Sequence, residues 1–301
     1  NFLCETWSEQ ELLQQNLGPI CLYLGGGFKE ITKSVCVGGG AVTNIIVLES
    51  TQTEADTRLI LHAVYSFHKK DVDRIVIHAK YTDIIEMCIY YGGTLLDESK
   101  QLWIRTKQEH YLPNHEMAAA LRTAQCKALI FIHSLSGRDT VSYPCFTSKK
   151  NWFSVSKRSN ISALVDYAEN DQNDLSETVR NQARELLIKV YAKKGDDFEG
   201  TDPDSFRVYK FLNNKSTLLK LLSPTEDSFY MHLNRAPLAT MIDKNAHISK
   251  PPIPSYTDYG WTIENVRLFP TMTLQPAWPE QVGYIFSVKP LVTYILADGS
   301  L

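Results

Sequence analysis

The first half of the chain alternates between short apolar runs and longer segments with apolar residues at every third or fourth position. Residues 41–48 are apolar and rich in β-branched side chains, which predicts a buried strand. Residues 54–70 carry a broad apolar stripe of helical period. A second apolar run at 74–79 and a helical pattern at 83–91 follow. This order predicts an α/β fold with a parallel central sheet flanked by helices.

Further elements are predicted on both sides of this unit. They are a helix over residues 8–17, a strand over 19–24, a hairpin made of 102–105 and 109–112, and helices over 114–120 and 128–133. These elements continue the α/β pattern as far as a polar stretch at 169–174. We take that stretch as a domain boundary.

The second half of the chain is predicted to be mainly helical. Residues 175–193 and 226–246 have the period of long helices. Prolines, aromatics and polar residues alternate over 251–278, which favours an extended segment, and the apolar run at 282–296 has no evident partner. The chain therefore divides into an α/β domain over residues 1–170, a helical region over 171–250 and an extended C-terminal segment over 251–301. Because the chain begins without Met, we expect part of the first domain to be missing at its N-terminus.

Composition indicates an ordinary folded protein. Hydrophobic residues make up 44% of the 301 residues and charged residues 22%. The net charge of −3 gives no overall sign of a nucleic-acid binder, although a local basic patch is compatible with it. Six cysteines lack any paired spacing, and no run is long enough to cross a membrane. We expect reduced thiols, no membrane association, and a nuclear or cytoplasmic location.

Four acidic residues follow the predicted strands at points where open α/β sheets build their sites. Glu54 and Asp56 come after the first long strand, Asp83 after the second, and Asp139 after the apolar run that ends near residue 133. Carboxylates from separate segments suit Mg²⁺ or Mn²⁺, because hard cations prefer oxygen ligands and keep positions for water and phosphate.

An ordinary structural role would also explain the first of these acids. Thr53 and Asp56 have the spacing of a capping box, and Glu54 and Arg58 have that of an ion pair one helical turn apart. Residues two apart on a regular helix point about 200° apart. Glu54 and Asp56 can therefore share a metal only if one of them lies in the irregular entry turn. His133 adjoins an apolar segment, where a hydrogen-bonded core histidine is expected.

Several short words occur in a fixed order along the chain: "TEADTRLILHA", "YTDII", "LWIRT", "HSLSGRDTVS" and "KKNWF". In order and spacing they resemble a group of uncharacterised invertebrate and transposon-associated proteins. That group is similar to divergent flap-endonuclease and PIN-like nucleases. The resemblance covers about residues 2–280. It implies a PIN-like α/β domain in an intracellular nuclease.

The resemblance also implies roles for particular residues. Glu54, Asp56, Asp83 and Asp139 would be the catalytic carboxylates, and they would bind Mg²⁺ or Mn²⁺. Lys149 and Lys150 would contact nucleic acid, although a solvated helix start is the commoner explanation for two such lysines.

The chain departs from the family pattern in three places. Tyr81 stands where the family has an acid, and a phenol cannot replace a carboxylate ligand at neutral pH. Residues 144–148 are bulky where the family has glycines that let the backbone approach phosphate. The cysteine-rich tail of the family is also missing.

Two functions follow as hypotheses. The first is a divergent nuclease with a degenerate active site, which acts on or binds DNA or RNA. The second is a non-catalytic scaffold for protein interaction, derived from a nuclease fold. The sequence leaves open the oligomeric state and the choice between DNA and RNA.

Overall fold

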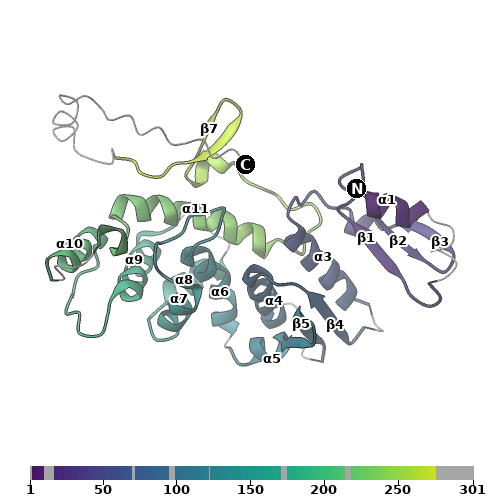
Figure 1. Cartoon of the computed structure of the whole chain (residues 1–301), viewed down its shortest axis with the longest axis horizontal. Coiled ribbons are helices and arrows are strands. Elements are labelled where there is room, and N and C mark those ends of the chain that lie inside the picture. The colour runs from purple at the N-terminus through teal and green to yellow at the C-terminus, as the bar shows by residue number, and fades with distance from the viewer. Residues whose placement is uncertain are drawn as a thin grey trace.

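The computed structural model describes residues 2–9, 17–69, 72–94, 99–121, 123–170, 175–213 and 218–275. Figure 1 shows an elongated α/β molecule with small sheets towards one end and helices towards the other. Most of the predicted helix at 8–17 and the whole apolar run at 282–296 lie outside the described residues. The general α/β class that the sequence predicted is confirmed.

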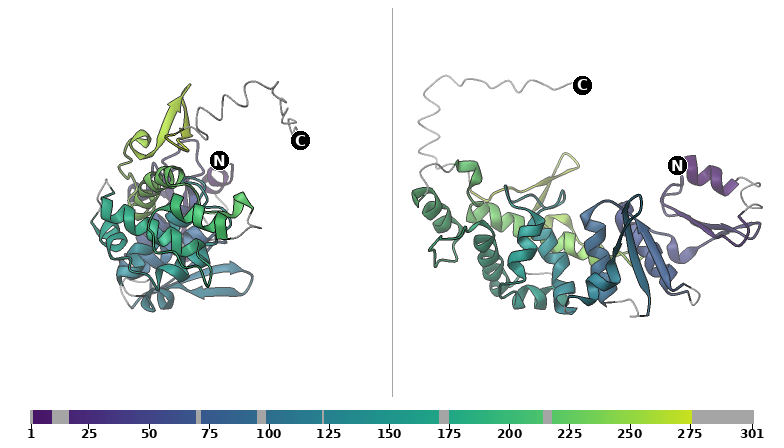
Figure 2. Two further views of the ribbon diagram at one scale, coloured as in Figure 1. Left: turned by 90° about the vertical axis from the view of Figure 1, so that its left-hand side faces the viewer. Right: turned by 60° about the horizontal axis from the view of Figure 1, so that its bottom comes forward.

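The N-terminal part forms its own antiparallel sheet, which lies at one end of the molecule in Figure 1 and in the right-hand view of Figure 2. Its strands are β1 (Leu22–Gly25), β2 (Ser34–Gly38) and β3 (Ala41–Asn44), and helix α1 (Phe2–Glu9) lies beside it. Gly39 and Gly40 have φ of 59° and 77°, so the chain reverses tightly between β2 and β3.

The prediction of a buried strand over residues 41–48 is wrong. All four residues of β3 are exposed, and a short 3-10 helix η1 (Ile46–Leu48) follows. The reason is the glycine turn, which pairs β3 with β2 and not with the next strand of an α/β sheet.

The second sheet contains a parallel pair of strands. Strand β4 (Arg74–His78) lies parallel to β5 (Gln101–Lys107), and β6 (His110–Pro113) returns antiparallel to β5. The predicted hairpin of 102–105 and 109–112 is confirmed. Only Ile77 of β4 is buried, because β4 is an edge strand. The described residues therefore contain small antiparallel and mixed sheets, and the predicted parallel central sheet is not confirmed.

Two helices pack against this second sheet. Helix α3 (Ala55–Phe67) and helix α4 (Thr82–Thr94) confirm the predicted helices at 54–70 and 83–91. Their apolar faces share one buried cluster with Ile77 and Ile104 of the strands. The starts of both helices are consequently held close together.

The rest of the described chain is mainly helical, as predicted. The helices are α5 (Asn114–Ala119), α6 (Thr123–Ser136), α7 (Lys149–Ser156), α8 (Ser162–Glu169), α9 (Glu177–Tyr191), α10 (Pro203–Asn213) and α11 (Glu226–Lys244), with a 3-10 turn η2 (Leu219–Leu221). The helical period predicted for 175–193 is confirmed on α9, whose apolar residues at that period are buried: Val179, Ala183, Leu186, Leu187 and Val190.

Helix α11 joins the two halves of the molecule. It packs along α6, and one buried cluster unites Phe131 and Trp152 with Leu187 and Phe229. Residues from both sides of position 170 therefore share a core. The division of the chain at residues 170 and 250 stays a prediction.

The segment after α11 is less extended than predicted. It contains a 3-10 turn η3 (Tyr256–Tyr259) and a hairpin of β7 (Trp261–Glu264) and β8 (Arg267–Pro270), which lies over α11 (Figure 1). Arg235 of α11 donates a hydrogen bond of 2.5 Å to the carbonyl of Thr271. Within the described residues, no helix has the length and apolar character needed to cross a bilayer.

Candidate functional site

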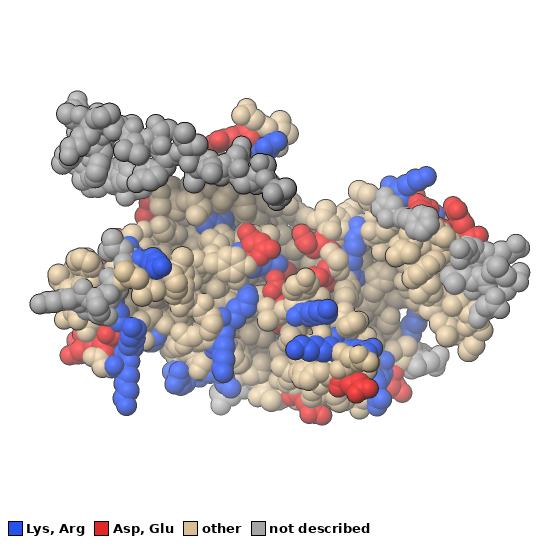
Figure 3. Space-filling view, viewed as in Figure 1, with Lys and Arg blue, Asp and Glu red and all other residues tan. Residues whose placement is uncertain are grey.

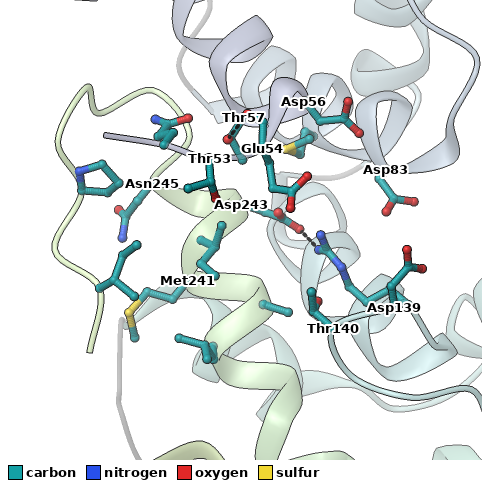
Figure 4. Close-up of a pocket in the computed structure, with 18 of the residues that line it drawn as sticks. Thr53, Glu54, Asp56, Thr57, Asp83, Asp139, Thr140, Met241, Asp243 and Asn245 are labelled. Carbon is teal, nitrogen blue, oxygen red and sulfur yellow. Dashed lines mark hydrogen bonds and ion pairs between the residues drawn. The ribbon is translucent and has the colours of Figure 1, made fainter. Parts of the chain in front are cut away.

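A cavity of about 770 Å³ lies where four parts of the chain meet. Its walls come from the start of α3, the start of α4, the loop after α6, and α11 with the segment that follows it. All four predicted carboxylates, Glu54, Asp56, Asp83 and Asp139, line this cavity (Figure 4). Figure 3 shows acidic side chains gathered over the junction of these helices, with basic side chains around them.

The entry turn of α3 lets two acids face the cavity. Glu54 is the N-cap residue, with extended backbone angles of φ −79° and ψ 137°, and Asp56 lies in the first helical turn. Residues two apart would diverge on a regular helix. Because Glu54 is outside the helix, both side chains line the cavity. This is the irregular entry turn that a shared site requires.

The alternative structural roles of these acids are not observed. The N-cap is Glu54 and not Thr53, and its side chain makes no capping hydrogen bond. The guanidinium of Arg58 donates to the carbonyls of Gln52, Ser50 and Ile31. The capping box and the Glu54–Arg58 ion pair are therefore both wrong as explanations of the acidic pair.

Asp56 carries the clearest electrostatic signature in the site. Burial raises the pKa of its carboxyl, and the negative charges of Asp83 and Glu54 raise it further. Among the described residues, none donates a hydrogen bond to this side chain. The entry turns of α3 and α4 therefore bring carboxylates into mutual repulsion.

Asp83 lies in the first turn of α4, after β4 as expected. It accepts a hydrogen bond of 3.2 Å from Thr82, and Nε2 of His133 lies 3.4 Å from its Oδ1. His133 is buried, and burial lowers its pKa to about 3. The imidazole is thus neutral at pH 7 and does not balance the charge of Asp83.

Glu86 is an acid that the sequence analysis missed. It lies one helical turn after Asp83, is only 4% exposed, and neither carboxylate oxygen has a hydrogen-bond partner. Nδ1 of the neutral His133 lies 3.6 Å from Oε2 of Glu86, and burial raises the pKa of Glu86 well above its usual range. Both ring nitrogens of His133 also lack a hydrogen bond, so the expected satisfied core histidine is not found. The sequence feature that could have revealed Glu86 is its position between Ile85 and Met87, in a mostly apolar run of helical period.

The loop after α6 carries Asp139. Gly137 turns this loop with φ of 107°, and a Cβ there would lie 2.8 Å from the ring of Tyr143. The hydroxyl of Tyr143 donates to Asp139 at 2.6 Å. This bond lowers the pKa of Asp139 and raises that of Tyr143 to about 12. Asp139 is therefore ionised and exposed at the cavity.

A buried ion pair closes the inner side of the cavity. The guanidinium of Arg138 donates to Asp243 of α11, whose side chain is 1% exposed. Burial raises the pKa of Asp243 to about 6 despite the opposing charge of Arg138. No local sequence pattern indicates this pair, because its members are 105 residues apart.

The two lysines predicted to contact nucleic acid differ in position. Lys149 is half-buried, lines the cavity and donates from Nζ to the carbonyl of Gly137 at 2.9 Å. Burial lowers the pKa of Lys149. Lys150 is exposed and is not part of the cavity wall. Tyr81, at the position where the family has an acid, is 71% exposed and also lines the cavity.

The donor set fits a hard divalent cation with few protein ligands. Five carboxylates line the cavity against the cations Arg138 and Lys149, and Glu86 lies buried behind them. Within the described parts of the chain, no group of three or more His, Cys, Asp or Glu residues could hold a metal ion. Mg²⁺ commonly uses one or two carboxylates, with water and substrate phosphate as its other ligands. Asp56 and Asp83 line the same cavity and are close enough for their charges to interact.

Comparisons with known proteins give no match to any protein family, curated protein or solved structure. The function is therefore inferred from the geometry of the cavity.

Proposed function

We propose that this chain is a divergent nuclease-like protein whose cavity binds Mg²⁺ or Mn²⁺ and acts on or binds the phosphodiester backbone of nucleic acid. The observation that supports this proposal most directly is the gathering of Glu54, Asp56 and Asp83 on one cavity, where burial and the neighbouring negative charges raise the pKa of Asp56. A divalent cation would relieve that repulsion. Strand β4, the parallel β5 and the acid at the start of α4 support a PIN-like arrangement for this part of the chain.

Each group has a role in this proposal. Asp56 and Asp83 would hold the cation, which would supply charge stabilisation and an activated water. Asp139 is exposed on the same cavity and could orient that water. Lys149 places a positive charge beside the carboxylates, where a phosphate oxygen could accept from it.

The direct test is metal binding, measured through thermal stability. A ligand that binds only the native state raises the melting temperature by mass action. Mn²⁺ at millimolar concentration should raise the Tm of the wild-type chain by several degrees. Asp83→Asn should reduce that shift by at least half. Asp166→Asn, on the exposed side of α8, is the matched control and should respond as the wild type does. An equal shift in all three proteins would contradict the assignment.

Catalysis is tested separately on labelled single-stranded DNA and RNA with Mn²⁺. Cleavage that is lost in Asp83→Asn and kept in Asp166→Asn is the expected result for an active enzyme. Metal binding without cleavage would indicate a degenerate site that holds the cation but has lost catalysis.

Two observations favour the second candidate, a non-catalytic scaffold. Arg138 already places a guanidinium among the carboxylates and is paired with Asp243. Tyr81 removes a carboxylate from the same rim. A wild-type chain with no response to Mn²⁺, and a Tyr81→Asp variant that gains one, would identify a scaffold that has lost its metal.

A further inference from the structure

Helix α10 has two apolar faces. On its inner face Phe206 is fully buried, and the ring of Phe206 packs against that of Phe198. Val208, Phe211 and Leu212 are spaced three and four residues apart, so they form a second apolar stripe along the same helix. Because successive residues turn by about 100°, this stripe lies on the side of α10 opposite Phe206.

The second stripe is exposed. Val208 is 57% exposed, Phe211 52% and Leu212 68%. A surface helix normally has one apolar stripe and a polar opposite face, whereas a helix that is apolar on more sides is normally buried. Within the described parts of the chain, α10 therefore lacks an element that covers its outer stripe.

The last described residues lie beside the start of this helix. The backbone N–H groups of Leu274 and Gln275 each donate at 2.8 Å to the carboxylate of Asp227, in the first turn of α11. The N–H of Glu226 donates at 3.0 Å to Asp204, in the first turn of α10. In Figure 1 this last described segment runs back over α11 towards α10. Gln275 is thus held where α10 and α11 begin.

The sequence that follows has matching chemistry and sufficient reach. Residues 282–296 are mainly apolar, and Lys289 alone carries a charge among them. Val282 is seven residues beyond Gln275, so the two can be separated by up to about 25 Å. Helix α10 has 11 residues and is about 16 Å long. The apolar run can therefore reach the whole stripe.

We propose that residues 282–296 of the same chain pack on the outer stripe of α10 and supply the element that covers it. Removal of the three apolar side chains from water favours this contact. The short connection to Gln275 favours it over a contact with a second copy of the chain, because a short flexible linker gives a local concentration in the millimolar range. The contact is independent of the proposed metal site.

Photo-crosslinking in the full chain tests the contact. The photoreactive amino acid p-benzoylphenylalanine is placed at position 211, and the crosslinked peptide is sequenced by mass spectrometry. The expected product joins position 211 to a residue of 282–296 within one chain. Leu212→Asp puts a charge into the stripe and should lower the yield of that product about fivefold.

Ile31→Asp is the matched control and should keep the yield. Ile31 is 72% exposed and lies between β1 and β2, at the other end of the molecule (Figure 1). Circular dichroism should show that both variants keep the helix content of the unsubstituted chain, so that a lower yield reports the contact and not unfolding.

Three results would overturn the proposal. A product that joins two chains, with a yield that rises with protein concentration, would assign the stripe to a second copy. A crosslink to other residues of the same chain, or no crosslink, would show that the run does not cover α10. Equal yields in Leu212→Asp and Ile31→Asp would show that the contact does not depend on the apolar stripe.

Discussion

The carboxylates of the cavity differ in how their charge is balanced. Asp139 has a hydroxyl donor and Asp243 a guanidinium, whereas burial and the charges of Asp83 and Glu54 raise the pKa of Asp56 against the smaller opposing effect of Arg138. Glu86 is the extreme case, because it is buried and neither oxygen has a hydrogen bond. A buried carboxylate without hydrogen bonds is either protonated or requires a bound cation to neutralise its charge.

Glu86→Gln tests this reading. The carboxyl has a raised pKa in the folded state, so the native protein binds more protons and loses stability as pH rises above the unfolded value of 4.5. The isosteric amide has no such loss. In metal-free buffer at pH 8, Glu86→Gln should be more stable than the wild type by about 1–3 kcal/mol, measured by urea unfolding.

The same comparison at pH 5 should give a smaller difference, because the wild-type carboxyl is then largely protonated. A variant that is less stable than the wild type at both pH values would show that the ionised carboxylate has a partner outside the described residues.

At the scale of elements, α11 holds the site together from one side. Its Asp243 pairs with Arg138, which fixes the loop that also carries Asp139. Arg235 lies about two turns before Asp243 on the same helix. It donates to the carbonyl of Val141 at 2.6 Å and so anchors the other end of that loop. The loop is therefore positioned by a helix that lies far away in the sequence.

Removal of one partner should show how strongly this contact matters. Asp243→Asn leaves the buried guanidinium of Arg138 without its counter-charge, and the expected loss of unfolding free energy is about 3–5 kcal/mol. Glu185→Gln breaks the exposed pair with Lys189 on α9 and should cost no more than about 0.5 kcal/mol. Similar losses in the two variants would show that Arg138 finds another partner or reaches solvent.

The helices and strands also show which parts of the fold can be predicted from the sequence. Helices α3, α4 and α9 were predictable because a helix is specified by local period. Strand β3 was misassigned because its partner is chosen by the Gly39–Gly40 turn and not by its apolar content. The four acids were found because each follows a predicted element. Glu86, Arg138 and Asp243 were missed, since their importance comes only from contacts across the fold.

At the scale of the whole molecule, buried neutral histidines make stability depend on pH. His232 of α11 accepts a hydrogen bond from Ser142 at Nδ1, and its Nε2 lies 3.0 Å from the carbonyl of Leu135. Burial lowers its pKa to about 4 from the ordinary 6.5. The stability that it contributes is complete above pH 6.5 and is lost as pH falls towards 4, because only the unfolded chain takes up the proton.

His232→Gln keeps a donor and an acceptor but does not titrate. Between pH 7 and pH 4 the wild type should lose on the order of 3 kcal/mol more unfolding free energy than this variant, measured by urea unfolding across the range. Parallel pH profiles for the two proteins would mean that His232 is protonated in the native state.

The pairing of Arg138 with Asp243 also has a consequence for biosynthesis. A ribosome that adds about 5–20 residues per second needs roughly 5–20 s to travel from one of these codons to the other. During that interval the loop with Asp139 exists without the helix that secures it. Every nascent chain thus passes through a stage in which the four acidic residues have been synthesised but the cavity has not formed. That stage ends only when α11 is complete.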